Sequence, residues 1–262
     1  MTFLPASWRD AWRARQERAA LARRAIPDKL WRRTLKRFAF LPQEGPREQL
    51  LRRLSSLFLD RKEFTGAHGL QITDDMVVAI AAQACLPVLQ LGLQAYDGFV
   101  GIVVHPGQAR VRRERMDEHG IVHEDEEILA GEAVDGGPVM LSWRDVRASG
   151  ASAAEGYNVV IHEFAHVLDM TDGLANGRPL LPAGLSAQAW DTLMLAEYEA
   201  FCLRVDAEEA TGLDPYGAQA LEEFFAVASE AYFVQPEVLA QEHPQLLALL
   251  GRYYEPAGQN RD

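Results

Sequence analysis

The feature that most constrains this chain is an apolar segment carrying ionisable side chains at a fixed spacing. Residues 159–169 read Val-Val-Ile-His-Glu-Phe-Ala-His-Val-Leu-Asp, and the segment contains the pattern HExxH without proline or glycine. Such a run favours a buried helix, on which residues four apart share one face. We therefore expect His162 and His166 to point at a common spot, with Glu163 one position around the helix.

Two imidazoles and a carboxylate that face a core need partners, because burying an unpartnered polar group is costly. A metal ion satisfies both imidazoles. Zinc lowers the pKa of its bound water from about 15.7 to about 7, and a nearby carboxylate passes the proton to the leaving amine. We predict a zinc-dependent peptidase in which His162 and His166 bind Zn²⁺ and Glu163 is the catalytic base. A polar stripe on an ordinary helix is the alternative, since HExxH also occurs by accident.

A catalytic zinc site takes a third protein ligand and keeps a fourth position open. Glu223 is the expected ligand, because it precedes the apolar residues 224–227 on a later helix that can pack across the first. Asp169 is the rival, but its short side chain reaches a shared ion poorly, and we expect it to bond a ring nitrogen or a loop amide. Glu230, on nearly the same face as Glu223, is either an acceptor for a ligand histidine or a surface carboxylate.

Hydrophobic periodicity and turn residues outline the remaining elements. The expected helices are 7–62 with breaks at its prolines, 76–93, 155–170, 186–206, 218–233 and 244–254, and the expected strands are 99–104, 121–129 and 138–143. Pro87 should kink or break the second helix. The loop 171–186 has little periodicity and is a candidate wall or lid. The predicted fold class is α+β, mainly helical with a small central mixed β-sheet.

Length and cysteine usage bound the class of protein. At 262 residues and 48% hydrophobic composition, the chain can bury one sizeable core without disulfides. Cys85 and Cys202 show no metal-binding spacing, so both are expected to be reduced thiols. The N-terminus lacks a signal-peptide pattern, and no uncharged apolar run approaches the roughly 18–20 residues that cross a bilayer. We expect a cytoplasmic protein with no membrane partner.

Charge is distributed unevenly along the chain. Residues 1–62 hold 16 Lys and Arg against 6 Asp and Glu, whereas the remaining residues hold 10 against 32. We predict a basic helical segment, residues 1–45, packed on or extending from a body formed by residues 46–262. The segment either docks on the acidic body or faces an acidic partner. Nucleic acid is not an expected partner, because no reading motif accompanies the arginines.

Two motifs carry a family resemblance. HEFAHVLD, followed about 60 residues later by EFFAVASEAYF, resembles the zinc peptidases of the Mlc titration factor A family and, more remotely, the catalytic domain of anthrax lethal factor. The segments QACLPVLQLGL and YDGF share the likeness, which spans about residues 45–255. The resemblance implies a zincin-like fold with an HExxH active-site helix, in which His162, His166 and Glu223 match the metal ligands and Glu163 the base. It also implies that Tyr216 lies near the metal and donates to the developing oxyanion.

Three functions follow from these motifs. The leading hypothesis is an aminopeptidase-like or restricted-specificity peptidase acting on a peptide or protein substrate. Family members are associated with aminopeptidase-like activity and with binding a glucose-responsive transcription repressor. The second hypothesis is therefore a regulatory protein that sequesters a repressor, with a structural or vestigial zinc site. An amide hydrolase with a non-peptide substrate is the third. Glu163 favours catalysis, because binding zinc does not require it.

Overall fold

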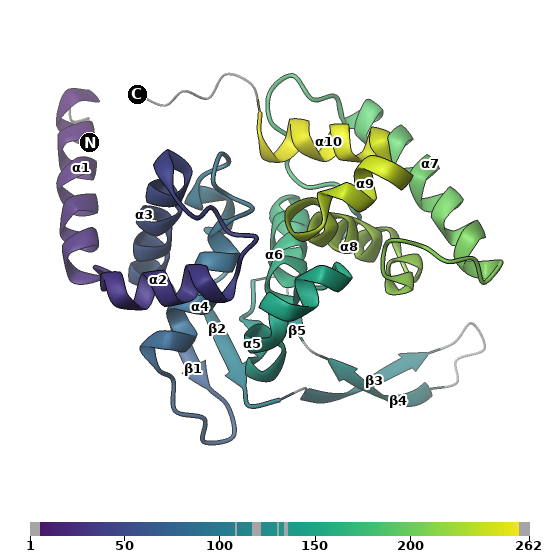
Figure 1. The fold of residues 1–262 in the computed structure, drawn as a ribbon, viewed down its shortest axis with the longest axis horizontal. Coiled ribbons are helices and arrows are strands. Elements are labelled where there is room, and N and C mark those ends of the chain that lie inside the picture. The colour runs from purple at the N-terminus through teal and green to yellow at the C-terminus, as the bar shows by residue number, and fades with distance from the viewer. Residues whose placement is uncertain (1–5, 108, 117–121, 130, 134–135, 257–262) are drawn as a thin grey trace.

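A helical body surrounds a small sheet in the computed structural model, which describes residues 6–107, 109–116, 122–129, 131–133 and 136–256 (Figure 1). The α-helices of this part are α1 (Ala6–Arg23), α2 (Asp28–Arg37), α3 (Gly45–Arg61), α4 (Asp74–Cys85), α5 (Trp143–Ser152), α6 (Val159–Asp169), α7 (Ala187–Asp206), α8 (Leu221–Val234), α9 (Pro236–Glu242) and α10 (Pro244–Tyr254). Single 3₁₀ turns are η1 (Leu93–Tyr96), η2 (Ala153–Glu155), η3 (Met170–Asp172) and η4 (Pro215–Ala218).

The central sheet has the strand order β1-β2-β6-β5. Its strands are β1 (Glu63–Gly66), β2 (Gly101–His105), β5 (Gly131–Ala133) and β6 (Val139–Ser142). The first three in spatial order are parallel, with Phe64 opposite Ile102 and Ile102 opposite Val139. β5 is an antiparallel edge strand, with Gly131 opposite Leu141. The sheet is therefore mixed, as predicted, and the α+β class is confirmed.

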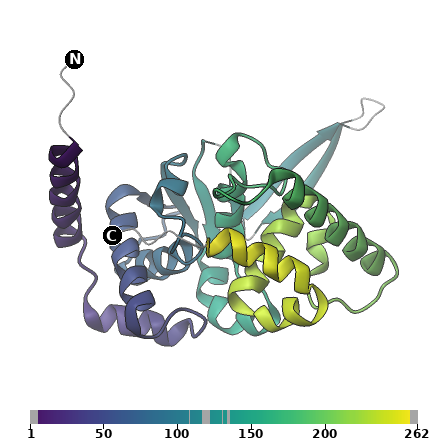
Figure 2. The ribbon, with the colours of Figure 1, turned by 90° about the horizontal axis from the view of Figure 1, so that it is seen from above.

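A separate two-stranded sheet is formed by β3 (Ala109–Met116) and β4 (Val122–Leu129). It projects from the body in both views (Figures 1 and 2). The predicted strands coincide with β2, β4 and β6, but sequence reasoning missed three others. β1 and β5 are only four and three residues long, and β3 reads Ala-Arg-Val-Arg-Arg-Glu-Arg-Met, which lacks the apolar alternation of a half-buried strand.

Several predicted boundaries needed correction. The expected strand 138–143 ends at Ser142, whose side chain accepts a hydrogen bond from the Asp145 backbone and begins α5, a helix that the sequence analysis missed. The expected helix 155–170 begins only at Val159, because Gly156 adopts a left-handed conformation with φ +79°. The expected helix 76–93 ends at Cys85, two residues before Pro87, which confirms the break at this proline.

Helix α6 is held in the middle of the molecule by packing on all sides. Figure 1 shows it between the N-terminal helices α2–α4 and the C-terminal group α7–α10. The Phe164 ring lies in an aromatic cluster, with ring centroids 5.7 Å from Phe58, 5.0 Å from Tyr96 and 5.6 Å from Phe99. Such tilted and edge-to-face pairs stabilise the core beyond the area they bury. The cluster fixes the helix that carries HExxH.

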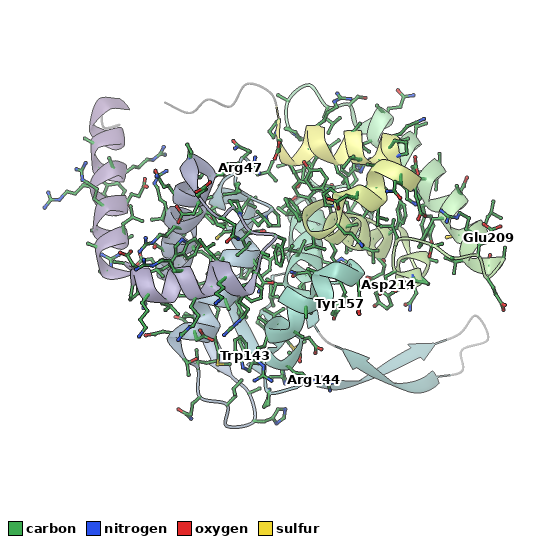
Figure 3. The ribbon with its side chains drawn as sticks, in the orientation of Figure 1. Arg47, Trp143, Arg144, Tyr157, Glu209 and Asp214 are labelled. Carbon is green, nitrogen blue, oxygen red and sulfur yellow. The ribbon has the colours of Figure 1, made fainter. Side chains whose placement is uncertain are left out.

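The N-terminal helices contact the body through ion pairs. Arg33 and Arg37 of α2 lie 2.8 and 3.0 Å from the Asp75 carboxylate of α4. Within the body, Arg47 of α3, labelled in Figure 3, pairs with Glu255, the residue that follows α10, at 2.9 Å. Exposed pairs of this kind contribute only about 0–1 kcal/mol each. In the part of the chain that the structure describes, no helix combines the length and apolarity required to cross a membrane.

Candidate metal centre

Three sequence-predicted side chains meet where α6 packs against α8. His162 Nε2 lies 3.2 Å from His166 Nε2, and Glu223 Oε2 lies 3.1 Å from the first nitrogen and 3.3 Å from the second. These three atoms come from two helices, and His162 and Glu223 lie 61 positions apart in the chain. The donor set that the sequence predicted is therefore brought together in space.

The spacing of these atoms matches one face of a coordination tetrahedron. A tetrahedral ion with bonds of about 2.0–2.1 Å sets its donor atoms about 3.3 Å apart. The three observed separations, 3.1, 3.2 and 3.3 Å, all lie near this value. The residues present fit a single metal ion held by two nitrogens and one oxygen.

The contact made by the other ring nitrogen of His162, Nδ1, supports the same conclusion. This atom lies 2.7 Å from Glu230 Oε1, so the ring donates from Nδ1 to this buried carboxylate. With Nδ1 occupied in this way, Nε2 faces the His166 ring and the Glu223 carboxylate, where it can hold either a proton or a metal ion. A metal ion between these atoms, or protons on the imidazoles, would satisfy all three. The geometry therefore fits a bound cation.

A buried polar network extends from Glu230 to a third helix. The second Glu230 oxygen accepts from the backbone N–H of Asn158, whose side-chain amide donates to Gln83 of α4 at 2.9 Å. The Asn158 oxygen also accepts from the Ile161 backbone at 3.0 Å and caps the start of α6. Sequence analysis missed Asn158 and Gln83. The signal for Asn158 was its position directly before the apolar run, where Asn is a preferred N-cap.

The charges of the site perturb its titration. Burial alone would lower the pKa of His162, but the Glu230 and Glu223 carboxylates outweigh burial and raise this pKa well above its ordinary value. Burial would raise the pKa of Glu223, yet hydrogen bonds and attraction from both imidazoles hold it far below its usual range. Burial raises the pKa of Glu230, against the hydrogen bonds it accepts. The cluster thus attracts positive charge strongly.

Glu163 is buried beside the three donor atoms but does not join them. Burial raises the pKa of its carboxyl to about 7, and its Oε2 has no hydrogen-bond partner among the described residues. A Cβ added to Gly131 of β5 would lie 2.4 Å from Glu163 Oε1. Only glycine permits this close approach of the edge strand, a role that the sequence analysis did not foresee. The Glu163 carboxylate is therefore kept against the edge strand with one oxygen available.

Asp169 bonds a loop amide, one of the two contacts expected for it. Its buried carboxylate accepts from the Gly177 backbone N–H at 2.8 Å, and burial raises its pKa to about 6. The Gly177 carbonyl accepts from the Trp190 indole at 2.9 Å. Gly177 has φ +74°, and an added Cβ would lie 2.9 Å from the Leu221 carbonyl at the start of α8. This contact anchors the loop 171–186 between α6 and α8.

Tyr216 lies on the turn η4, next to the His162 ring. The two ring centroids are 6.0 Å apart, and Asp214 caps the turn, because its side chain accepts from the Tyr216 backbone at 2.9 Å. Figure 3 labels Asp214 close to Tyr157, the residue that leads into α6. The tyrosine is therefore placed beside the donor atoms by its own capped turn.

Two imidazoles and a carboxylate that converge from two helices, beside a second buried carboxylate, define a candidate mononuclear metal centre with the donor types of zinc hydrolases. The chain belongs to the family described as glucose-regulated metallo-peptidase M90, whose sequence model matches residues 9–255. The resemblance to the Mlc titration factor A family is thus confirmed, and the family match extends further toward the N-terminus than residue 45.

Similar proteins come from several bacteria. An uncharacterized protein of Synechocystis sp. is 36% identical over 250 residues, which cover 94% of this chain and 89% of that protein. Mlc titration factor A of Pectobacterium atrosepticum is 36% identical over 216 residues, which cover 81% of this chain and 80% of that protein. The Mlc titration factor A of Serratia proteamaculans is 36% identical over 217 residues and 82% of each chain.

Proposed function

We propose that the chain is a zinc-dependent peptidase of zincin-like fold, either aminopeptidase-like or of restricted specificity. The observation that carries the proposal is the set of three donor atoms 3.1–3.3 Å apart, with the buried Glu163 carboxylate beside them. Membership in a metallo-peptidase family supports it. Residues 46–262 would form the catalytic body, with the basic segment 1–45 attached to it.

His162, His166 and Glu223 would hold the metal. Bound Zn²⁺ supplies a Lewis acid that polarises the scissile carbonyl and lowers the pKa of water to about 7. Glu230 fixes the His162 ring through Nδ1, so Nε2 is aimed at the ion site. Asp169 holds the adjoining loop through Gly177. These contacts fix the ligands before any substrate arrives.

Glu163 would act as the general base. Its Oε2, which no described residue bonds, lies in a buried site, where it can accept a proton from the attacking water and pass it to the leaving nitrogen. Tyr216, beside the His162 ring, would donate a hydrogen bond to the oxygen on which negative charge develops. Together the two residues would supply proton transfer and charge stabilisation at one carbonyl.

Replacing Glu163 tests the mechanism directly. In Glu163→Gln the zinc affinity and the melting temperature should stay near those of the wild type, whereas peptide turnover should fall by about 10²–10⁴. Glu155→Gln, an exposed glutamate just before α6, is the matched control and should leave turnover unchanged. Wild-type turnover in Glu163→Gln would refute the mechanism.

The names of the relatives favour a second candidate function. Two of them are named Mlc titration factor A, which supports a regulatory protein that binds a transcription repressor, with a structural or vestigial zinc site. The two functions separate in the Glu163→Gln variant. A pure binding protein would hold purified repressor with unchanged affinity, and neither the variant nor the wild type would cleave peptides.

A further inference from the structure

A cavity of about 650 Å³ lies beside the metal centre without including its donor atoms. Its walls are largely apolar and come from the C-terminal half of α6, the segment 91–99, the loop 171–186 and α10; they include Phe99, Val167, Leu168, Met170, Leu181 and Tyr253. Among the described residues that line it, Asp97 is the one with a formal charge at neutral pH. The volume lies in the range of ligand pockets, about 300–1,000 Å³.

The cavity begins one helical turn beyond the metal centre along α6. Val167 lies one helical turn after Glu163, and Met170 lies one turn after His166, so the cavity wall begins about 5–6 Å further along the helix axis. An extended peptide advances about 3.3 Å per residue. A side chain one or two positions from the scissile bond would therefore reach the cavity.

The edge strand β5 also runs from the metal centre toward the cavity. β5 begins at Gly131, against the Glu163 carboxylate, and the turn after β5 contributes Gly136 to the cavity wall. A peptide that lay along this edge would pass the metal centre and then the cavity. Helix α6 and strand β5 thus both lead from the metal centre toward the cavity.

The cavity wall includes a large apolar side chain that is exposed to water, Leu180. Leu180 lines the cavity and is 71% exposed, Leu174 follows the lining residue Gly173 and is 57% exposed, and Val100 follows Phe99 and is 70% exposed. The other large exposed hydrophobic residues of the described chain are Trp12, Leu195 and Leu203. Leu180 is thus an exposed apolar side chain in the cavity wall, and Leu174 and Val100 are chain neighbours of lining residues; exposed apolar surface at a cavity is typical of a binding site.

We propose that this cavity binds a bulky apolar side chain of the peptide substrate, within two residues of the scissile bond. The inference rests on the proposed peptidase function and adds the class of substrate. Phe, Leu, Met and similar side chains match the apolar walls. An acidic side chain is disfavoured, because it would lose hydration against apolar walls.

Filling the cavity provides the test. A Cβ added at Gly98, which lines the cavity, or at Gly107, which follows β2, meets no atom within 4 Å, and neither glycine has a positive φ. Gly98→Phe should therefore fill the cavity without disturbing the fold, and Gly107→Phe is the matched control. A peptide library is digested by each zinc-loaded protein, and cleavage sites are read by mass spectrometry. The wild type and Gly107→Phe should prefer bulky apolar residues over Ala by at least about 10-fold at one position near the scissile bond.

Gly98→Phe should lose this preference while it still cleaves peptides with Ala there. An unchanged preference in Gly98→Phe would overturn the inference and leave the Glu163 mechanism intact. If the wild type cleaves no peptide, the peptidase proposal fails, and the cavity is judged by the affinity of a Phe-containing peptide. That affinity should be at least about 10-fold weaker for Gly98→Phe than for Gly107→Phe. Equal affinities would overturn the inference.

Leu180 gives a second pair of variants. Leu180→Ser removes an exposed leucine from the cavity wall, and Leu203→Ser removes one of nearly equal exposure, 70%, from α7. Only Leu180→Ser should weaken the preference for bulky apolar residues. An equal preference in both variants would contradict a role for Leu180.

Discussion

Replacing Glu230, which is not one of the three donor residues, with glutamine should weaken metal binding. Glu230 accepts two hydrogen bonds, one from His162 Nδ1 at 2.7 Å and one from the Asn158 backbone. A glutamine has one oxygen, so Glu230→Gln can satisfy only one of these N–H groups. If the oxygen keeps Asn158, the new amide N–H faces Nδ1, and the hydrogen of His162 moves to Nε2, where it blocks the metal.

The loss of the His162 contact and the loss of the Asn158 contact can each be estimated as a free energy. Loss of an orienting partner for a ligand histidine typically costs 10–100-fold in metal affinity, which is about 1.4–2.7 kcal/mol. A buried N–H left without an acceptor costs about 1–3 kcal/mol of the metal-free fold. At this chain length each kcal/mol lowers the melting temperature by about 2–4 °C. Glu230→Gln should therefore bind zinc about 10–100-fold more weakly and, without metal, melt below the wild type.

Zinc affinity is measured by competition with a chromophoric chelator, and the hydrogen on the His162 ring by ¹⁵N NMR of the metal-free protein. Glu222→Gln is the control, because it changes a partly exposed glutamate on the same helix, next to Glu223. Zinc affinity within twofold of the wild type, together with an unchanged His162 tautomer in Glu230→Gln, would refute the reasoning.

Three further predictions follow from the site. Tyr216→Phe should lower kcat more than it raises KM, because the phenol acts on charge that develops in the transition state; a change confined to KM would assign it to substrate binding instead. Burial raises the pKa of Asp169 from 3.8 to about 6, so between these values the folded chain binds more protons there than the unfolded chain, and its free energy of unfolding falls as the pH rises. Asp169→Asn should make the fall in the free energy of unfolding smaller by up to about 3 kcal/mol, as measured by denaturation at several pH values. Parallel curves of unfolding free energy against pH for the two proteins would contradict this. Zinc at about 100 times its Kd should stabilise the wild type by about 2.7 kcal/mol, or roughly 5–10 °C in the melting temperature, and Glu223→Gln should show a smaller shift; equal shifts would exclude Glu223 as a ligand.

The sequence predicted the centre of the site better than its surroundings. HExxH specifies its own geometry, because residues four apart on a helix must share a face, so His162 and His166 were placed correctly by local rules alone. Glu223 could be proposed because an apolar run marks the helix that carries it. The Asn158 to Gln83 contact joins residues 75 positions apart, and no local pattern indicates which buried amides will meet.

The edge strand shows the same limit. β5 has three residues and contains Gly131, so neither its length nor its composition predicts a strand. Its place in the sheet is decided by pairing with β6, which the structure alone shows. The close approach of Gly131 to Glu163 is likewise a property of tertiary packing.

The double attachment of Gly177 determines where this chain tolerates changes in length. The amide of Gly177 is bonded to Asp169, eight residues earlier, and its carbonyl to Trp190, thirteen residues later. An inserted residue before Gly177 would have to bulge outward or pull on the end of α6, and one after it is likewise enclosed by the Trp190 bond, by the Arg178–Asp191 pair and by the Leu180 backbone N–H, which donates to Thr171 at 3.2 Å. Surface grafts and affinity tags are therefore best placed outside residues 169–190, where extra chain would strain neither bond of Gly177.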